Sequence, residues 1–439
     1  MKTAALHNLG CKVNAYETEA MQQLLEADGY EIVPFTERAD VYVINTCSVT
    51  NMADRKSRQM IHRAKKLNPD AIVVAAGCYV QTASQSDTLD LSADIIIGNN
   101  KKNELVPEIH KFLEDHKQNI DIIDINDGVQ DYEVLHVTKT AEHTRAFIKI
   151  QDGCNQFCSY CVIPYARGRV RSRDKDDVVR EIKGLAEFGY QEVVLTGIHL
   201  SSYGVKDEYG LIDVIEAVQE IPGIRRIRLG SLEPMIVTEE FASRASKVDK
   251  LCPHFHLSLQ SGCDETLKRM NRKYTTEEFK ASVDYLRKYF EHPAITTDVI
   301  VGFPGETEEE FRETKKYLEM IHFYEMHVFK FSIRKGTRAE RMPDQIPEQI
   351  KSQRSEELIR LAGEMSKEFR EEDLHKDVCV LMEEPMELDG QTYWTGFTEE
   401  YVRYAVKSDE DLHNRFVRGK AERFLNDEIM LMETYELEK

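Results

Sequence analysis

Short runs of apolar residues alternate with amphipathic helical stretches through the first part of the chain. Apolar runs of this length predict buried strands, and helices between them favour a parallel sheet. We expect four such strands, at residues 3–7, 41–45, 72–76 and 95–97. The pattern therefore predicts an N-terminal parallel α/β domain over residues 1–115.

A polar stretch without helical periodicity follows, and we assign residues 116–144 to a linker. Strand and helix signals then alternate again over residues 145–372. The six strands are expected at 147–150, 192–195, 226–229, 256–259, 298–301 and 326–331. Strands that alternate with helices favour a parallel barrel over an antiparallel sandwich, so this region is predicted to form a partial (β/α)6 barrel.

The pattern changes over residues 373–439 to a small all-β module. Its five short strands are expected at 377–382, 393–398, 402–406, 416–424 and 428–435. A compact barrel of five strands is a common nucleic-acid-binding fold. The module is more acidic than basic, so binding would depend on a local face. Its aromatic residues either stack on bases or pack in the core: Tyr393, Trp394, Phe397, Tyr401 and Tyr404.

The net charge of −20 over 439 residues argues against nucleic-acid binding across the whole surface. Two local clusters of basic residues modify this picture. One stretch lies at 55–66, and four arginines alternate further on, at Arg167, Arg169, Arg171 and Arg173. A solvated charged face is the alternative for both. The N-terminus lacks a secretory apolar core and no run approaches the ~18 apolar residues of a membrane span, so we expect a cytoplasmic protein without a membrane partner.

Three cysteines follow the first strand of the predicted barrel in a C-x3-C-x2-C pattern: Cys154, Cys158 and Cys161. Catalysis in such barrels takes place at the carboxyl ends of the strands. Three thiolates can hold three irons of a 4Fe-4S cluster and leave the fourth iron open to a small molecule. Structural zinc is the competing interpretation, but zinc sites usually include a fourth Cys or His nearby, and none follows here.

Three further cysteines each follow a strand of the N-terminal domain, at Cys11, Cys47 and Cys78. The carboxyl ends of parallel strands meet at one edge of a sheet, so these thiols are expected to converge. Taken singly, each would most commonly be a buried small hydrophobic residue. Together they predict a second cluster site. Cys252, Cys263 and Cys379 match no cluster pattern and are interpreted as structural thiols.

With both cysteine sets placed, the whole chain resembles the radical-SAM methylthiotransferases, where SAM is S-adenosylmethionine. These enzymes have an N-terminal three-cysteine domain, a radical-SAM barrel and a C-terminal TRAM domain. The supporting segments are Asn45-Thr46-Cys47, Ala76-Gly77-Cys78, the central triad, and residues 163–168, 257–262 and 298–307. Residues 158–161 and 166–173 are most similar to the enzymes that act on threonylcarbamoyladenosine in tRNA.

The resemblance implies transfer of a methylthio group to carbon 2 of N6-threonylcarbamoyladenosine at position 37 of tRNA. It implies two 4Fe-4S clusters, an auxiliary one on Cys11, Cys47 and Cys78 and a SAM-binding one on the central triad. One SAM would supply the methyl group, and cleavage of a second would supply the radical that activates the base. Contacts with SAM are expected at four strand ends and at one aromatic residue: Gly197, Ser231, Gln260, Val301 and Tyr160.

The implied partners are the tRNA anticodon loop, held by the TRAM module and the four alternating arginines, and a reductant such as flavodoxin or ferredoxin. A monomer is expected. Two alternatives stay open. The same chemistry can serve isopentenyladenosine tRNA or a ribosomal-protein aspartate. A different class of protein, a non-catalytic iron–sulfur electron carrier fused to an RNA-binding module, would close each cluster with four protein ligands.

Overall fold

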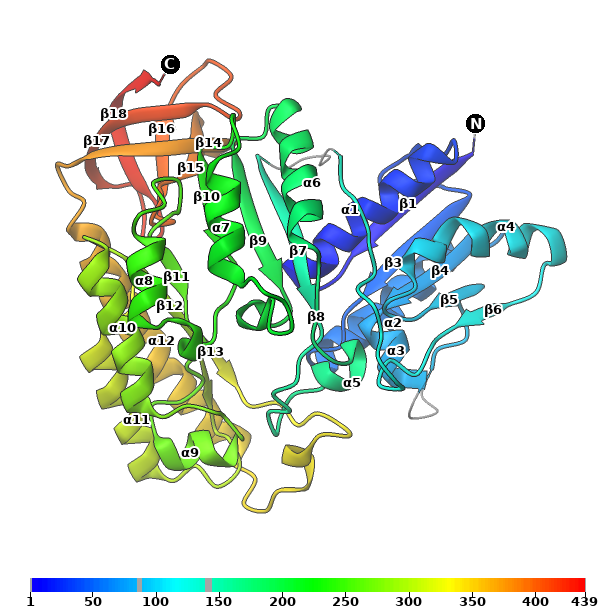
Figure 1. Cartoon of the computed structure of the whole chain (residues 1–439), viewed down its shortest axis with the longest axis horizontal. Coiled ribbons are helices and arrows are strands. Elements are labelled where there is room, and N and C mark those ends of the chain that lie inside the picture. The colour runs from blue at the N-terminus through cyan, green and yellow to red at the C-terminus, as the bar shows by residue number, and fades with distance from the viewer. Residues whose placement is uncertain (1, 85–88, 139–143, 439) are drawn as a thin grey trace.

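The computed structural model describes residues 2–84, 89–138 and 144–438. Figure 1 shows three units that follow the chain order. The N-terminal sheet lies on the right of the view, the central strands and their helices occupy the middle and left, and the C-terminal barrel lies at the top left. Among the described helices, none combines the length and apolar character that a membrane crossing requires.

The N-terminal sheet is parallel throughout, with the order β2-β1-β3-β4-β5-β6. Its strands are β1 (Thr3–Asn8), β2 (Glu31–Ile32), β3 (Val41–Thr46), β4 (Ile72–Gly77), β5 (Ile95–Ile97) and β6 (Asn119–Asp121). All four predicted strands are present. The additional strands β2 and β6 are only two and three residues long, too short for a periodic signal.

Helices cover both faces of this sheet, which explains why β3 and β4 are buried along their whole length. The helices are α1 (Lys12–Ala27), α2 (Asn51–Leu67), α3 (Cys78–Ser84) and α4 (Leu105–Asp115), with a 3-10 turn η1 (Lys102–Glu104) before α4. Apolar residues of α2 and α3 form one core, and those of α1 and α4 form another on the opposite face. Two-sided burial is typical of parallel sheets and produces continuous apolar runs.

The predicted linker is partly structured. Strand β6 extends the sheet to Asp121, and Leu135 and Val137 are buried against Tyr16 and Ala20 of α1. The segment also contacts the central unit, because Tyr132 donates to the Lys149 carbonyl and the Val137 amide donates to Glu181. Its polar composition gave no sign of this packing. Residues 139–143 of the expected linker lie outside the described part of the chain.

The central unit has six parallel strands, of which five lie where they were predicted and the one expected at 256–259 lies at 254–256. They are β7 (Arg145–Asp152), β9 (Glu192–Gly197), β10 (Arg226–Leu229), β11 (His254–His256), β12 (Ala294–Val301) and β13 (Glu325–Lys330). A short strand β8 (Arg171–Ser172) pairs antiparallel with β7. Isolated bridges from Ile227 to Leu251 and from Leu232 to Leu257 join the two halves, β10-β9-β7-β8 and β11-β12-β13. The result is an open, partial barrel.

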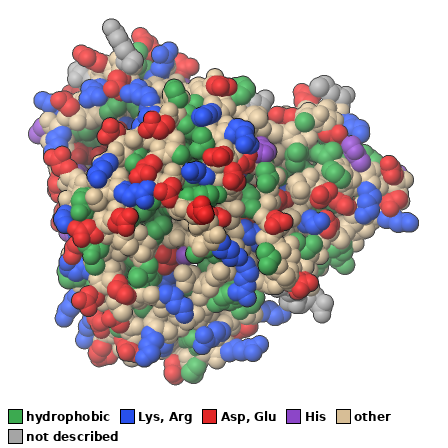
Figure 2. Space-filling model, viewed as in Figure 1, with side chains coloured by type: hydrophobic (Ala, Val, Ile, Leu, Met, Phe, Trp, Pro, Cys, Tyr) green, Lys and Arg blue, Asp and Glu red, His purple; other side chains and the backbone are tan. Residues whose placement is uncertain are grey.

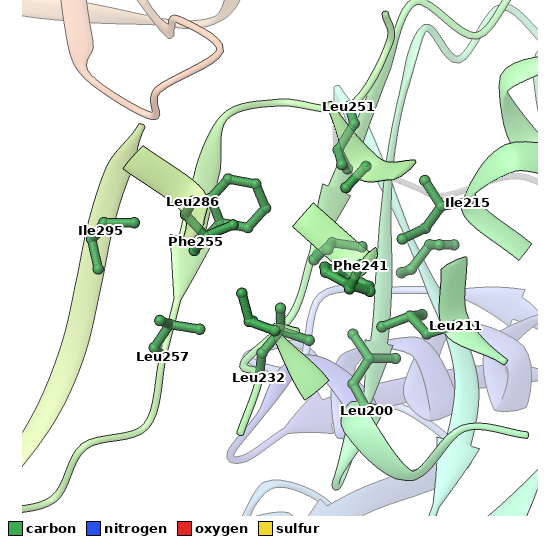
Figure 3. Close-up of a cluster of buried hydrophobic side chains, with 14 of the residues drawn as sticks. Leu200, Leu211, Ile215, Leu232, Phe241, Leu251, Phe255, Leu257, Leu286 and Ile295 are labelled. Atoms are coloured by element: carbon green, nitrogen blue, oxygen red, sulfur yellow. The ribbon is translucent and has the colours of Figure 1, made fainter. Parts of the chain in front are cut away.

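Helices on the outer side of these strands cover the main apolar core. They are α6 (Lys175–Glu187), α7 (Leu211–Gln219), α8 (Glu239–Ala245), α9 (Asp264–Arg269), α10 (Thr276–Tyr289), α11 (Glu308–Ile321) and α12 (Glu348–Glu371). Figure 3 shows Leu286 of α10 beside Phe255 of β11 on one side of this core, and Leu211 and Ile215 of α7 near Phe241 of α8 on the other side. This core fixes the strand ends that carry the candidate site.

The C-terminal module is a closed barrel with the order β14-β15-β16-β18-β17. Its strands are β14 (Asp377–Leu388), β15 (Gln391–Phe397), β16 (Arg403–Lys407), β17 (Phe416–Phe424) and β18 (Met430–Leu437). The five predicted strands are confirmed, and the neighbours are antiparallel except for β16 and β18. Closure removes exposed strand edges, so the module needs no partner to complete its sheet.

Buried arginines of the central unit attach this barrel. Arg226 donates to the carbonyl oxygens of Phe397 and Cys379, each at 2.8 Å. Arg228 donates to the carbonyl oxygens of Glu399 at 2.7 Å and Thr398 at 2.5 Å. Charged donors to buried carbonyls are strong hydrogen bonds, so the two units are held in a fixed relation.

Three of the five aromatic residues considered for base stacking are used within the protein. Tyr404 is fully buried and donates to Asp373. Phe397 and Tyr401 stack on each other with ring centroids 4.4 Å apart, and the Arg145 guanidinium lies 5.0 Å from both rings. These three side chains therefore serve packing and attachment rather than base stacking.

Candidate active site

The central cysteine triad lies in the loop between β7 and the short helix α5 (Ile163–Arg167). Gly153 begins the loop with a φ of +73°, and a Cβ atom there would lie 1.9 Å from the Arg169 carbonyl oxygen. Only glycine fits this close backbone approach. The Cys154 amide donates to the Gly168 carbonyl at 3.0 Å, which ties the start of the loop to its end.

The three thiols of this loop lie near one another, with Cys158 buried and Cys154 and Cys161 half-buried. Burial raises the pKa of Cys154 to about 11 and that of Cys161 to about 12, and the neighbouring Cys158 thiolate adds to both increases. Such thiols stay protonated at neutral pH unless a metal or cluster stabilises the thiolate. The Arg272 guanidinium lies 3.2 Å from the Cys158 sulfur, and the Gln156 amide lies 3.4 Å from the Cys154 sulfur. Hydrogen bonds to ligand sulfurs of this kind tune iron–sulfur clusters.

The second triad gathers at the carboxyl edge of the N-terminal sheet, as the strand order predicts. Cys11 precedes α1, Cys47 follows β3 and Cys78 begins α3. A Cβ atom on Gly10 would lie 2.8 Å from the Cys47 sulfur, so glycine is needed where the first and second loops meet. Burial raises the pKa of Cys47 to about 11, and the nearby Cys78 and Cys11 thiolates add to the increase.

The donor set of each triad decides which group it suits. Each offers three cysteine thiols, the ligands that hold iron–sulfur clusters. Structural zinc sites usually have four protein ligands, Cys or His. Among the described residues, the group of possible metal ligands whose donor atoms all lie within 4.8 Å of one another is a separate one, His256, Asp298 and His327.

The expected SAM contacts lie at the same end of the partial barrel as the central triad. Gly197 ends β9, Ser231 follows β10, Gln260 follows β11 and Val301 ends β12. Val301 is buried, its side chain lies in the core, and its carbonyl oxygen accepts from the Phe331 amide at 2.9 Å. Gln260 adopts a left-handed φ of +69°. SAM contact at these four positions stays a prediction.

Tyr160 packs within the protein. Its ring meets the edge of the Phe303 ring, with centroids 6.3 Å apart, and joins a small core with Met270 and Phe331. This contact joins the triad loop to the tip that follows β12. A role of Tyr160 in cofactor contact stays a prediction, and the packing role is the one the geometry supports.

Three of the four alternating arginines are buried, which corrects the expectation that they contact tRNA phosphates. Arg167 donates to Asn14 at 2.6 Å, to Glu17 at 2.8 and 3.0 Å, and to Asp152 at 3.1 Å. Its side chain is 0% exposed. Arg171 and Arg173 are also buried and have partners within the protein.

Arg171 donates to the carbonyl oxygens of Arg167 and Arg169, and Arg173 forms ion pairs with Asp177 and Glu181. Phosphate contact would require breaking these pairs in a site closed to solvent. Arg169 differs: it is exposed, and its guanidinium lies 4.7 Å from the Phe157 ring centroid. The sequence could not show this difference for Arg167, because its partner Glu17 lies 150 residues away along the chain.

The network around Arg167 links the two cysteine-bearing units. Glu17 and Asn14 belong to α1, which begins after Cys11, and Asp152 ends the strand that leads to Cys154. Burial by itself raises the pKa of Glu17, but the charges of Arg167, Lys102 and Lys149 hold it well below its ordinary value. Glu17 is therefore ionised at neutral pH and fixes α1 against β7.

Sequence reasoning missed the side chains that position the sulfurs. Arg272 is held by Glu233 at 2.6 Å while it contacts Cys158. Asn99 lies 3.5 Å from the Cys78 sulfur and donates to the Ala166 carbonyl at 2.7 Å, so it contacts both cysteine-bearing units. A lone Arg or Asn outside any cysteine motif gives no sequence signal for this role.

Comparison with known proteins follows this division of the chain. Residues 148–318 match the Radical SAM superfamily, and residues 3–98 match the uncharacterized protein family UPF0004. The chain is 41% identical to the threonylcarbamoyladenosine tRNA methylthiotransferase MtaB of Bacillus subtilis, over 96% of this chain and 94% of that protein. It is 34% identical to the tRNA-2-methylthio-N(6)-dimethylallyladenosine synthase of Moorella thermoacetica, over 96% of each chain.

Among solved structures, the radical SAM methyltransferase TsrM of Kitasatospora setae shares the fold. The TM-score is 0.58 at 16% sequence identity, with 77% of this chain and 74% of that chain covered. At this identity the similarity supports the arrangement of strands and helices and says nothing of the substrate.

Proposed function

Since the chain belongs to the radical-SAM tRNA methylthiotransferases, we propose that it converts N6-threonylcarbamoyladenosine at position 37 of tRNA to its 2-methylthio form. Relatives named for the threonylcarbamoyladenosine reaction are 36–41% identical to this chain, against 34–36% for relatives named for the dimethylallyladenosine reaction. The observation that carries the proposal is the pair of cysteine triads, one on each of two units that buried ion pairs hold together.

Radical chemistry suits this substrate because carbon 2 of adenine bears an unactivated C–H bond and has no leaving group. When bound to Cys154, Cys158 and Cys161, a 4Fe-4S cluster supplies the electron that cleaves SAM reductively. Cys11, Cys47 and Cys78 would hold the auxiliary cluster at which sulfur is methylated. The donor chemistry of both triads fits these groups.

The protein's own residues orient and shelter the chemistry. Arg272 donates to the Cys158 sulfur and is itself held by an ion pair with Glu233, which fixes one ligand of the SAM-binding site. Asn99 fixes Cys78 in the same manner. The Arg167 network sets the distance between the two triads, so that a base between them is presented to both.

The remaining partners follow from the substrate. The C-terminal barrel and the exposed Arg169 would contact the anticodon arm through phosphates, which position an RNA without reading its sequence. Figure 2 shows acidic and basic side chains interspersed over one face, which fits local rather than broad contact with RNA. The target base must leave the loop stack to reach the cysteines. A flavodoxin or ferredoxin would supply electrons to a cytoplasmic monomer.

Mass spectrometry of tRNA nucleosides from cells lacking this protein tests the substrate. We expect loss of the 2-methylthio nucleoside and accumulation of unmodified threonylcarbamoyladenosine. Loss of the methylthio mark on isopentenyladenosine would instead assign the related substrate, and an unchanged nucleoside profile would overturn the proposal.

Cysteine variants test whether one triad serves SAM cleavage and the other serves sulfur insertion. Cys158→Ala should abolish cleavage of SAM by anaerobically reconstituted protein. Cys47→Ala should retain some cleavage and lose sulfur insertion, and iron and sulfide analysis should show one cluster fewer in each variant. Cys252→Ala is the matched control, because this buried cysteine lies outside both triads. A wild-type protein that releases no deoxyadenosine would support the electron-carrier alternative.

A further inference from the structure

A cavity of about 700 Å³ opens between the two cysteine-bearing units. Its walls come from α2 and α3 of the N-terminal unit, from Val162 and Tyr165 at the start and middle of α5, and from the segment that follows β13. Tyr79, which directly follows Cys78, lies on one side, and Val162, which directly follows Cys161, lies on another. The cavity is therefore bounded by the immediate neighbours of one cysteine from each triad.

The lining of this cavity is basic although the whole chain is strongly acidic. Four cations, Arg58, Arg334, Lys335 and Arg341, face two carboxylates. Both carboxylates are already engaged: Asp54 pairs with Arg334 at 2.7 Å, and Glu340 accepts from the Gly336 amide at 2.8 Å. The cavity thus carries positive charge that its own acidic residues do not neutralise.

The loop after β13 is fixed to the N-terminal unit by Arg334. This buried side chain donates to Asn51 at 3.0 Å and to Ser48, the neighbour of Cys47, at 2.5 Å. Asn51 in turn donates to the Ile333 carbonyl at 2.9 Å. Arg334 is therefore occupied by structural contacts, and its anchoring holds the following residue, Lys335, at the cavity.

The other three cations are available to a ligand. Arg58, Lys335 and Arg341 are exposed, and none forms an ion pair with a carboxylate in the described part of the chain. Arg58 lies over the Tyr79 ring, 5.7 Å from its centroid, which holds its guanidinium at the wall formed by α3. An anion at the cavity would meet cations from two separate units of the protein.

We propose that this cavity binds the carboxylate of the threonylcarbamoyl group and that Lys335 and Arg341 select for it. The inference rests on the proposed function and adds the residues that determine the substrate. The threonylcarbamoyl group ends in a carboxylate and a hydroxyl, whereas an isopentenyl group is wholly apolar. A polar site that is left unpaired by an apolar analogue rejects that analogue strongly. The two cations therefore discriminate between the two modified adenosines.

A chemically edited substrate separates this inference from general RNA binding. The reconstituted enzyme would be given an anticodon stem-loop with threonylcarbamoyladenosine at position 37 and the same RNA with its threonyl carboxylate converted to the methyl ester. The ester keeps every phosphate and removes one charge. We expect esterification to lower kcat/KM roughly tenfold or more for the wild type, the range of a charged hydrogen bond. The Lys335→Met, Arg341→Met double variant should process both RNAs at similar, reduced rates.

Lys183→Met is the matched control, because this exposed lysine lies on α6 on the outer side of the central unit. It should keep the wild-type preference for the free carboxylate. If the wild type processes the ester as well as the acid, the inference is overturned while the proposed function stands. If the double variant keeps the full effect of esterification and loses affinity for every RNA, the cations bind phosphate and the inference again fails. A wild type inactive on the threonylcarbamoyl RNA would instead contradict the proposed function.

Discussion

Replacing Arg167 by methionine separates a structural role from an RNA-binding role. The guanidinium is fully buried, and it contacts Glu17, Asp152 and Asn14 within 2.6–3.1 Å. Removing one partner of a buried ion pair costs about 3–5 kcal/mol because the other charge stays buried without compensation. Lys149 and Lys102 still lie 2.7 and 3.1 Å from Glu17, so we expect the lower end, about 3 kcal/mol.

Urea unfolding followed by circular dichroism, with a thermal melt alongside, measures this loss. A destabilisation of this size should lower the melting temperature by roughly 5 °C. The neighbouring Arg169→Met variant is the control: its side chain is exposed, so stability should change by less than about 0.5 kcal/mol. The affinity of Arg169→Met for tRNA should fall, and its salt dependence should become shallower by about one unit of slope.

Unchanged stability together with weaker tRNA binding in Arg167→Met would contradict a structural role for this arginine. If Arg167→Met unfolds at the wild-type urea concentration and binds tRNA more weakly with a shallower salt slope, then Arg167 reaches phosphate and the buried network does not hold in solution.

Three further predictions follow from the site. Arg272→Met should lower the reduction potential of the SAM-binding cluster, because a charged donor to Cys158 is lost. Redox titration followed by electron paramagnetic resonance measures the potential, and Arg272→Lys should restore part of the loss. Gly153→Ala should reduce bound iron by about one cluster, whereas Gly184→Ala on α6, where a Cβ meets nothing within 4 Å, should leave the iron content unchanged. Basic neighbours hold the pKa of Glu17 below its ordinary value, so its contribution to stability is present above the unfolded pKa of about 4.3 and lost as pH falls further; Glu17→Gln should weaken this acid dependence in pH-dependent urea unfolding.

The strands and both cysteine triads could be predicted because their signals are local. A short apolar run that lies just before Cys47 or Cys78 reports both a buried strand and the edge where its thiol lies. The topology of parallel sheets then brings separate strand ends together without further information.

Features that depend on distant partners could not be predicted. Arg167 and Arg169 are two residues apart and equally basic, yet one is buried against Glu17 and the other is exposed. The cavity beside the triads forms only when Lys335 is brought next to α2 and α3 by Arg334. The strand β6 was missed for a different reason, since three residues are too few to show a period.

The buried contacts of Glu17 and Asn14 with Arg167 and Asp152 limit how this protein can be re-engineered or recombined. If the N-terminal unit alone were replaced, Arg167 would lose Glu17 and Asn14 and would be left with less compensation for its buried charge. The N-terminal unit therefore cannot be exchanged independently of the central unit. A chimera with a relative should be viable only when both halves are transplanted together. Substitutions at these positions are therefore expected to change in concert, and a single one is expected to require a compensating partner.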